Sequence, residues 1–230
     1  MQLFITHDPP GAHWQLDAPP PSAGAFALIG WSGEADGDGV PAPVADVLAT
    51  ALAACGRVTF ACSTVAAADA PGWQALDRDF VARIRARSAL GRFVTHLSGR
   101  APADLVLLST TETATVRHLF DDAGYPWHAQ AQVVLLSSAD APPPACDAIA
   151  SQPAALFSWL GGVEGLARAG VRAMLRPGVD GDVAGLFCAS RDVREVFETA
   201  LSRQALALGM PVQHVSEAAL MAGLAASRDT

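Results

Sequence analysis

Short apolar runs bounded by turn-forming residues recur along the chain, and longer segments with helical spacing lie between them. Short runs of this kind are typical of strands, whereas apolar residues three or four positions apart are typical of helices. The predicted strands span residues 3–6, 26–31, 57–62, 92–96, 105–109, 132–137, 184–189 and 211–215. The predicted helices span residues 43–54, 73–88, 113–123, 163–175 and 192–208.

The alternation of strands with helices predicts an α/β fold with a largely parallel sheet. The last helix has the clearest start signal, because Asp192 can cap it and Glu195 completes the spacing of a capping box. A weak internal repeat indicates two similar lobes, since the strand–turn–helix pattern that starts at Leu105 recurs in the carboxyl-terminal part of the chain. Unrelated strand–helix–strand units share this pattern, so chance similarity is the open alternative. We therefore expect two similar α/β lobes with largely parallel sheets flanked by helices, at 1–104 and 105–230.

The composition limits the chemistry that this chain can perform. Of its 230 residues, 51% are hydrophobic and 17% are charged, so the chain can bury a sizeable core. The net charge is -8, and all 15 basic residues are arginine. The absence of lysine excludes lysine Schiff bases, the phosphate-binding lysine of P-loops and the Tyr-x-x-x-Lys pair of short-chain dehydrogenases. An acidic chain also repels the phosphates of nucleic acids, so we expect no nucleic-acid partner.

The sequence also predicts where the protein resides. No run of about 18 apolar residues occurs, so we expect no membrane span. The amino terminus lacks the basic and apolar regions of a signal peptide. The four cysteines, Cys55, Cys62, Cys146 and Cys188, lack the C-x-x-C spacing of zinc and thioredoxin motifs, which fits free thiols in a reducing compartment. We therefore expect a cytoplasmic protein.

Two of the cysteines, Cys62 and Cys188, stand at the ends of predicted strands. If these strands are parallel, both thiols lie at the carboxyl edge of the sheet, where α/β proteins bind ligands and backbone N–H groups lower a thiol pKa. A pair of opposed thiols could then exchange protons with one carbon atom. The alternative is that both cysteines pack as small buried hydrophobic residues.

Three segments accompany the second of these cysteines: Val171-Arg-Ala-Met-Leu, Gly181-Asp-Val-Ala-Gly-Leu-Phe-Cys-Ala-Ser and Leu208-Gly-Met-Pro-Val-Gln-His-Val-Ser-Glu-Ala-Ala-Leu. Together they resemble the carboxyl half of the aspartate/glutamate racemase superfamily, and most of all its arylmalonate decarboxylase, maleate isomerase and hydantoin racemase branches. The resemblance covers mainly residues 171–222, with a thinner match around 43–64. It implies two pseudo-symmetric α/β lobes, each with a cysteine after a strand at the cleft between them.

By this resemblance, Cys188 matches the cysteine of the second lobe and Cys62 that of the first. The implied activity is that of a cofactor-independent racemase, isomerase or decarboxylase, in which the two thiols move a proton at the carbon next to a carboxylate. Neither a metal nor an organic cofactor is required. The small carboxylate substrate would be bound by the hydroxyl and backbone donors of Ser63, Thr64, Thr110 and Thr111.

A second hypothesis is a non-catalytic α/β interaction or scaffold subunit that has lost the active site. A chain with this little charge can cover part of its surface with a protein partner. It can equally cover that surface with a second copy of itself, so a homo-oligomer is also expected.

The histidines give a weaker signal than the cysteines. None of the six stands in a compact ligand spacing such as H-E-x-x-H. His96 and His214 follow predicted strands, and either could act as an acid or base in a cleft. A metal site assembled from distant histidines stays open.

Overall fold

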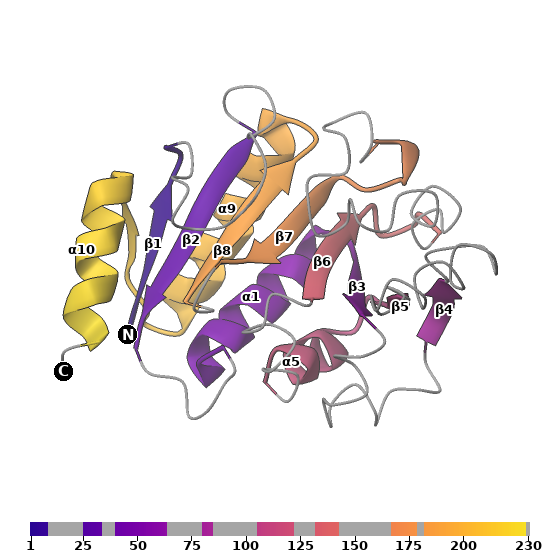
Figure 1. Cartoon of the computed structure of the whole chain (residues 1–230), viewed down its shortest axis with the longest axis horizontal. Helices are drawn as coiled ribbons and strands as arrows, with labels where there is room; N and C mark the ends of the chain where they lie inside the picture. The colour runs from indigo at the N-terminus through magenta and orange to yellow at the C-terminus, as the bar shows by residue number, and fades with distance from the viewer. Residues whose placement is uncertain are drawn as a thin grey trace, which may run out of the picture.

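The computed structural model describes residues 1–8, 25–33, 40–63, 80–84, 105–121, 132–142, 167–178 and 182–228. In this part of the chain nine strands form one sheet (Figure 1). The strands are β1 (Gln2–Thr6), β2 (Phe26–Ser32), β3 (Arg57–Ser63), β4 (Phe80–Ile84), β5 (Leu105–Thr110), β6 (Gln132–Ser137), β7 (Ala173–Pro177), β8 (Val183–Cys188) and β9 (Val212–His214). The helices are α1 (Ala42–Cys55), α5 (Thr113–Asp121), α9 (Arg191–Ala207) and α10 (Glu217–Arg228). This mixed content confirms the predicted α/β class.

The strands follow the order β4-β5-β3-β6-β7-β8-β2-β1-β9 across the sheet. Neighbouring strands run antiparallel at every pairing except β1–β9, which is parallel. The prediction of a largely parallel sheet is therefore wrong. An apolar run shows that a strand is buried, but its direction depends on the connection that precedes it, and that connection leaves no mark on the strand itself.

The sheet does not divide into two similar lobes at residue 104. β3 comes from the first half of the chain and lies between β5 and β6 from the second half, and β2 pairs with β8. The two segments that indicated a repeat do share their local structure, because β5 leads into α5 and β8 leads into α9. Both segments nevertheless contribute to one sheet and to one hydrophobic core.

Two predicted helices contain strands instead. β7 starts inside the predicted helix 163–175, and β4 lies inside the predicted helix 73–88. The remaining residues of 73–88, residues 163–166 and the predicted strand 92–96 lie outside the described residues. All five side chains of β7 are buried, so this strand has apolar neighbours on both faces of the sheet. A short, fully buried apolar run fits a helix and a strand equally well, which is why the prediction of a helix at β7 is wrong.

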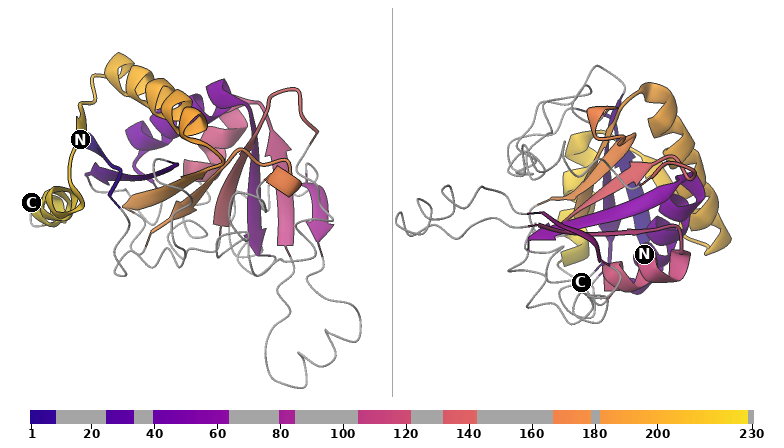
Figure 2. Two further views of the ribbon diagram at one scale, coloured as in Figure 1. Left: turned by 90° about the horizontal axis from the view of Figure 1, so that it is seen from above. Right: turned by 90° about the vertical axis from the view of Figure 1, so that its right-hand side faces the viewer.

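The helices cover both faces of the sheet (Figure 2). α1 packs between α5 and α9, and these three helices share one hydrophobic core with one face of the sheet. Half of the residues of α1 are buried, as expected for a central helix rich in Ala, Val and Leu. α10 covers the opposite face beside β1 and β2, where Leu220 and Leu224 pack with Phe4 and Leu28.

Ser190, rather than Asp192, caps α9. The helix begins at Arg191, and the Ser190 hydroxyl accepts a 3.3 Å hydrogen bond from the backbone N–H of Val193. Asp192 lies in the first turn, where a negative charge still favours the helix dipole. Glu195 forms an ion pair with Arg191 and does not close a capping box.

Candidate functional site

The antiparallel sheet places the two predicted catalytic cysteines at opposite ends. Cys188 pairs with Ala173 of β7, Ala173 is level with Leu136 of β6, and Leu136 is level with Val58 of β3. Cys62 lies four residues further along β3 than Val58. Three strand spacings and four residues of rise separate the two Cα atoms by roughly 20 Å. The structure therefore does not bring the two thiols to one carbon atom.

Both thiols are buried in the core that contains α1, α5 and α9. Burial is the main reason why the pKa of Cys188 rises from 9.0 to about 12, and the nearby carboxylate of Glu198 raises it further. Arg194 and Arg172 lower this pKa, but burial outweighs them. The Cys188 thiol is thus protonated at neutral pH, whereas a proton-abstracting cysteine must be a thiolate.

The predicted substrate donors are also separated. Ser63 ends β3 and Thr110 ends β5, and because these strands are antiparallel the two residues lie at opposite ends of the sheet. The Thr110 hydroxyl accepts a 2.9 Å hydrogen bond from the backbone N–H of Glu112. Thr111 is exposed to solvent, and Thr64 lies outside the described residues. No common binding site forms from Ser63, Thr110 and Thr111.

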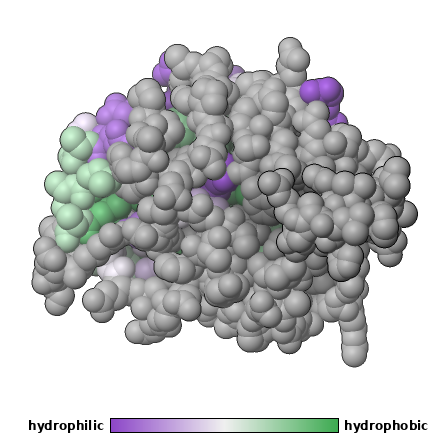
Figure 3. Space-filling model, in the orientation of Figure 1, coloured by the Kyte–Doolittle hydropathy of each residue, from purple (hydrophilic) through white to green (hydrophobic). Residues whose placement is uncertain are grey.

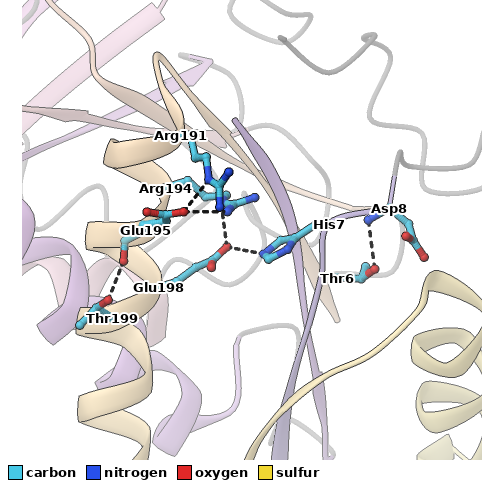
Figure 4. Close-up of polar contacts among 8 residues, drawn as sticks. All are labelled: Thr6, His7, Asp8, Arg191, Arg194, Glu195, Glu198 and Thr199. Carbon is cyan, nitrogen blue, oxygen red and sulfur yellow. Dashed lines mark hydrogen bonds and ion pairs between the residues drawn. The ribbon is translucent and has the colours of Figure 1, made fainter. Parts of the chain in front are cut away.

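The structure does gather charged groups where β1 ends beside α9 (Figure 4). His7 Nε2 lies 2.8 Å from Oε1 of Glu198, with the two side chains 41% and 11% exposed. Arg194 Nε lies 3.4 Å from the same oxygen, and its side chain is 7% exposed. Arg191 and Arg194 also pair with Glu195, at 2.6 and 3.6 Å. A half-exposed imidazole therefore rests on a buried carboxylate, which a buried guanidinium neutralises.

The alternation of side chains along β1 explains how His7 reaches this position. Ile5 faces the core with α9, and Phe4 faces the core with α10. His7 continues the first series and contacts α9. Asp8 continues the second, and its carboxylate accepts a 2.8 Å hydrogen bond from the backbone N–H of Glu217, the first residue of α10.

His214, at the end of β9, lies beside His7. The ring centroids are 5.8 Å apart and the ring planes are tilted by 58°. Because His214 is level with Ile5 in the parallel pairing, both rings lie on the α9 side of the sheet. The sequence identified His214 as a residue after a strand but gave it no partner, and His7 was absent from the predicted site. A His-Asp pair directly after a short apolar strand is the signal that could have found it.

α10 exposes an apolar face on the side away from the sheet. This face consists of Ala218, Met221, Ala222 and Ala225, all exposed to solvent. Figure 3 shows it as part of the green area at the side of the molecule where α10 lies. Positions i, i+3, i+4 and i+7 form one stripe along a helix, so the exposed apolar side chains are contiguous.

No group of three or more His, Cys, Asp or Glu side chains in the described residues has a geometry that could hold a metal ion. Within the same residues, none of the helices is long and apolar enough to cross a membrane. Comparison with protein-family models, curated proteins and solved structures finds no match to the chain. The resemblance to the racemase superfamily therefore stays a prediction.

Proposed function

We propose that this chain is a non-catalytic α/β subunit that associates with a second copy of itself through the exposed face of α10. The proposal rests on one observation: α10 is apolar on the side that faces the sheet and also on the side that faces solvent. Leu220 and Leu224 are buried against the sheet, and the opposite stripe from Ala218 to Ala225 has no charged residue. A helix on a free surface normally carries charged or polar side chains on its outer face, and an apolar outer face is typical of a helix that packs against another chain.

A second copy suits this face better than an unrelated partner. The exposed stripe is uncharged along its length, so it needs no complementary charge from a partner. Two copies of the helix packed antiparallel about a two-fold axis would bring one stripe against the other with their helix dipoles opposed. The small alanine side chains would allow a close helix–helix approach, at the short end of the usual 8–10 Å range. The overall charge of -8 would not oppose the contact locally, because the stripe itself is neutral.

Cysteine catalysis receives no comparable support. The proposed proton transfer needs two thiols on opposite sides of one carbon, and Cys62 and Cys188 are buried at opposite ends of the sheet. The scaffold hypothesis requires neither thiol to react.

Sedimentation velocity over a wide range of concentrations tests the proposal. The wild-type chain is expected to sediment as a concentration-dependent dimer, and Ala222→Glu to weaken the association by about tenfold or more, because an unpaired carboxylate would be buried in the contact. Thr199→Glu adds the same charge at an exposed position of α9 and serves as the matched control. A wild-type chain that stays monomeric, or a dimer unaffected by Ala222→Glu in a chain with native circular dichroism, would overturn the proposal.

A further inference from the structure

We infer that His7 and His214 form a two-histidine site for a late first-row divalent cation such as Zn²⁺, with Glu198 orienting the ring of His7. This site is independent of the association through α10, which lies on the other face of the sheet. Imidazole nitrogen is a preferred ligand of Zn²⁺, Ni²⁺ and Cu²⁺.

The positions of the two rings follow from the only parallel pairing in the described sheet. His214 is level with Ile5, and His7 lies two residues beyond Ile5 on the same face. The rings are therefore diagonal neighbours on adjacent strands, and their centroids lie 5.8 Å apart. His7 is 41% exposed and His214 is exposed, so a cation can reach both from solvent.

This separation suits two ligands of one ion. A Zn–N bond of about 2.1 Å places the ion roughly 3 Å from the centroid of each ring. Two rings bound to one ion in a near-tetrahedral arrangement then have centroids roughly 5 Å apart, with wider angles giving larger values. A small rotation of the exposed His214 ring would close the remaining difference.

Glu198 provides the second and independent feature of a metal ligand. Its carboxylate oxygen lies 2.8 Å from Nε2 of His7, and when Nε2 donates its hydrogen to this oxygen, Nδ1 is the nitrogen with a lone pair. A carboxylate on the far nitrogen of a ligating histidine sets its tautomer and raises its basicity. The buried guanidinium of Arg194 forms an ion pair with the same carboxylate oxygen, with Nε 3.4 Å away.

The surrounding charges are balanced and do not repel a cation. Arg191 and Arg194 on α9 are offset by Glu195 and Glu198 of the same helix. Asp8 is the next carboxylate along the chain, but it is bound to the N-terminus of α10 on the other face. Because the described residues supply no third ligand, water would complete the coordination, and we expect an exchangeable ion rather than a structural one.

Isothermal titration calorimetry with Zn²⁺ tests the inference on the full chain. Wild type is expected to bind one Zn²⁺ per chain, His214→Ala to lose at least about tenfold in affinity, and Glu198→Gln about 10- to 100-fold. His7→Ala should match His214→Ala. His118→Ala, on α5 at a distance from this site, is the control and should bind Zn²⁺ as wild type does.

Nitrogen-15 NMR of the imidazole rings gives a readout that does not depend on affinity. Zn²⁺ should shift Nδ1 of His7 and leave Nε2 bound to Glu198. His7 also links β1 to α9, so His7→Ala could fail to fold. In that case His214→Ala, which changes an exposed residue, decides the test. The inference is overturned if wild type shows no saturable binding, if His214→Ala binds Zn²⁺ unchanged, or if Nε2 of His7 is the nitrogen that responds.

Discussion

Burial decides the chemistry of individual side chains in this protein more than sequence position does. Cys188 stands after an apolar strand and before a capped helix, which in a parallel sheet would favour a reactive thiolate. In this sheet the same residue is fully buried, and its pKa is about 12. The sequence could locate the cysteines at strand ends, but it could not show which end of the sheet each strand reaches.

The thiol of Cys188 should therefore be unreactive in the folded protein. At pH 8 we expect iodoacetamide to alkylate Cys188 at least about 100-fold more slowly in the native chain than in guanidinium chloride, because the thiolate is the reacting species. Peptide mass spectrometry measures the extent at each cysteine. The raised pKa also means that the contribution of Cys188 to the free energy of unfolding falls as the pH rises above 9.0. In that range the thiol ionises in the unfolded chain before it ionises in the folded one. Rapid native alkylation of Cys188 would contradict the raised pKa and the burial of this thiol.

At the scale of elements, the turn between α1 and β3 depends on one glycine. Gly56 has φ +152°, and a Cβ atom added there would lie 2.1 Å from the backbone carbonyl oxygen of Ser137 in β6. A backbone atom held by its own strand cannot move aside, so the close approach of β6 requires glycine. Gly170 also has a positive φ, +72°, but open space surrounds it.

The two glycines give a matched pair for measuring this contact. Gly170→Ala should lower the free energy of unfolding by about 1 kcal/mol, which is the strain of an alanine in the left-handed backbone conformation. Gly56→Ala should lower the free energy of unfolding by about 1–3 kcal/mol more, because φ +152° with ψ -152° is a conformation essentially restricted to glycine and the added methyl group overpacks against β6. Urea denaturation of both variants gives the difference directly. Equal costs would mean that β6 moves away from Gly56 without penalty.

Long helices are predicted well from the sequence pattern, and short strands are not. The helix predicted at 192–208 differs from α9 by one residue at each end, because its amphipathic spacing runs over several turns. β7 and β4 lie where the sequence predicts helices, since a strand of five residues has too few positions to distinguish the period of a strand from that of a helix. The closeness of His7 to His214 could not be predicted, because a parallel pairing of the first and last strands of the described chain brings the two residues together.

At the scale of the whole molecule, one continuous sheet predicts one cooperative unit. Phe60 in β3 and Phe187 in β8 lie on opposite sides of residue 104 and are both buried in this sheet. Phe60→Ala and Phe187→Ala should each lower the free energy of unfolding by about 3–5 kcal/mol. Both should also lower the midpoint of the same single thermal transition. Calorimetry distinguishes this from two lobes, in which each variant would move only its own transition.

The end of β1 has a consequence for how the gene can change. His7 and Asp8 directly follow β1, and they reach α9 and α10 because they continue the alternation of its side chains between the two faces. A single inserted codon between Phe4 and His7 would turn the imidazole toward α10 and the carboxylate toward α9, whereas an insertion of two codons would return each side chain to its own face of the sheet. Insertions in the first strand should therefore be tolerated when they add an even number of residues, and not when they add an odd number.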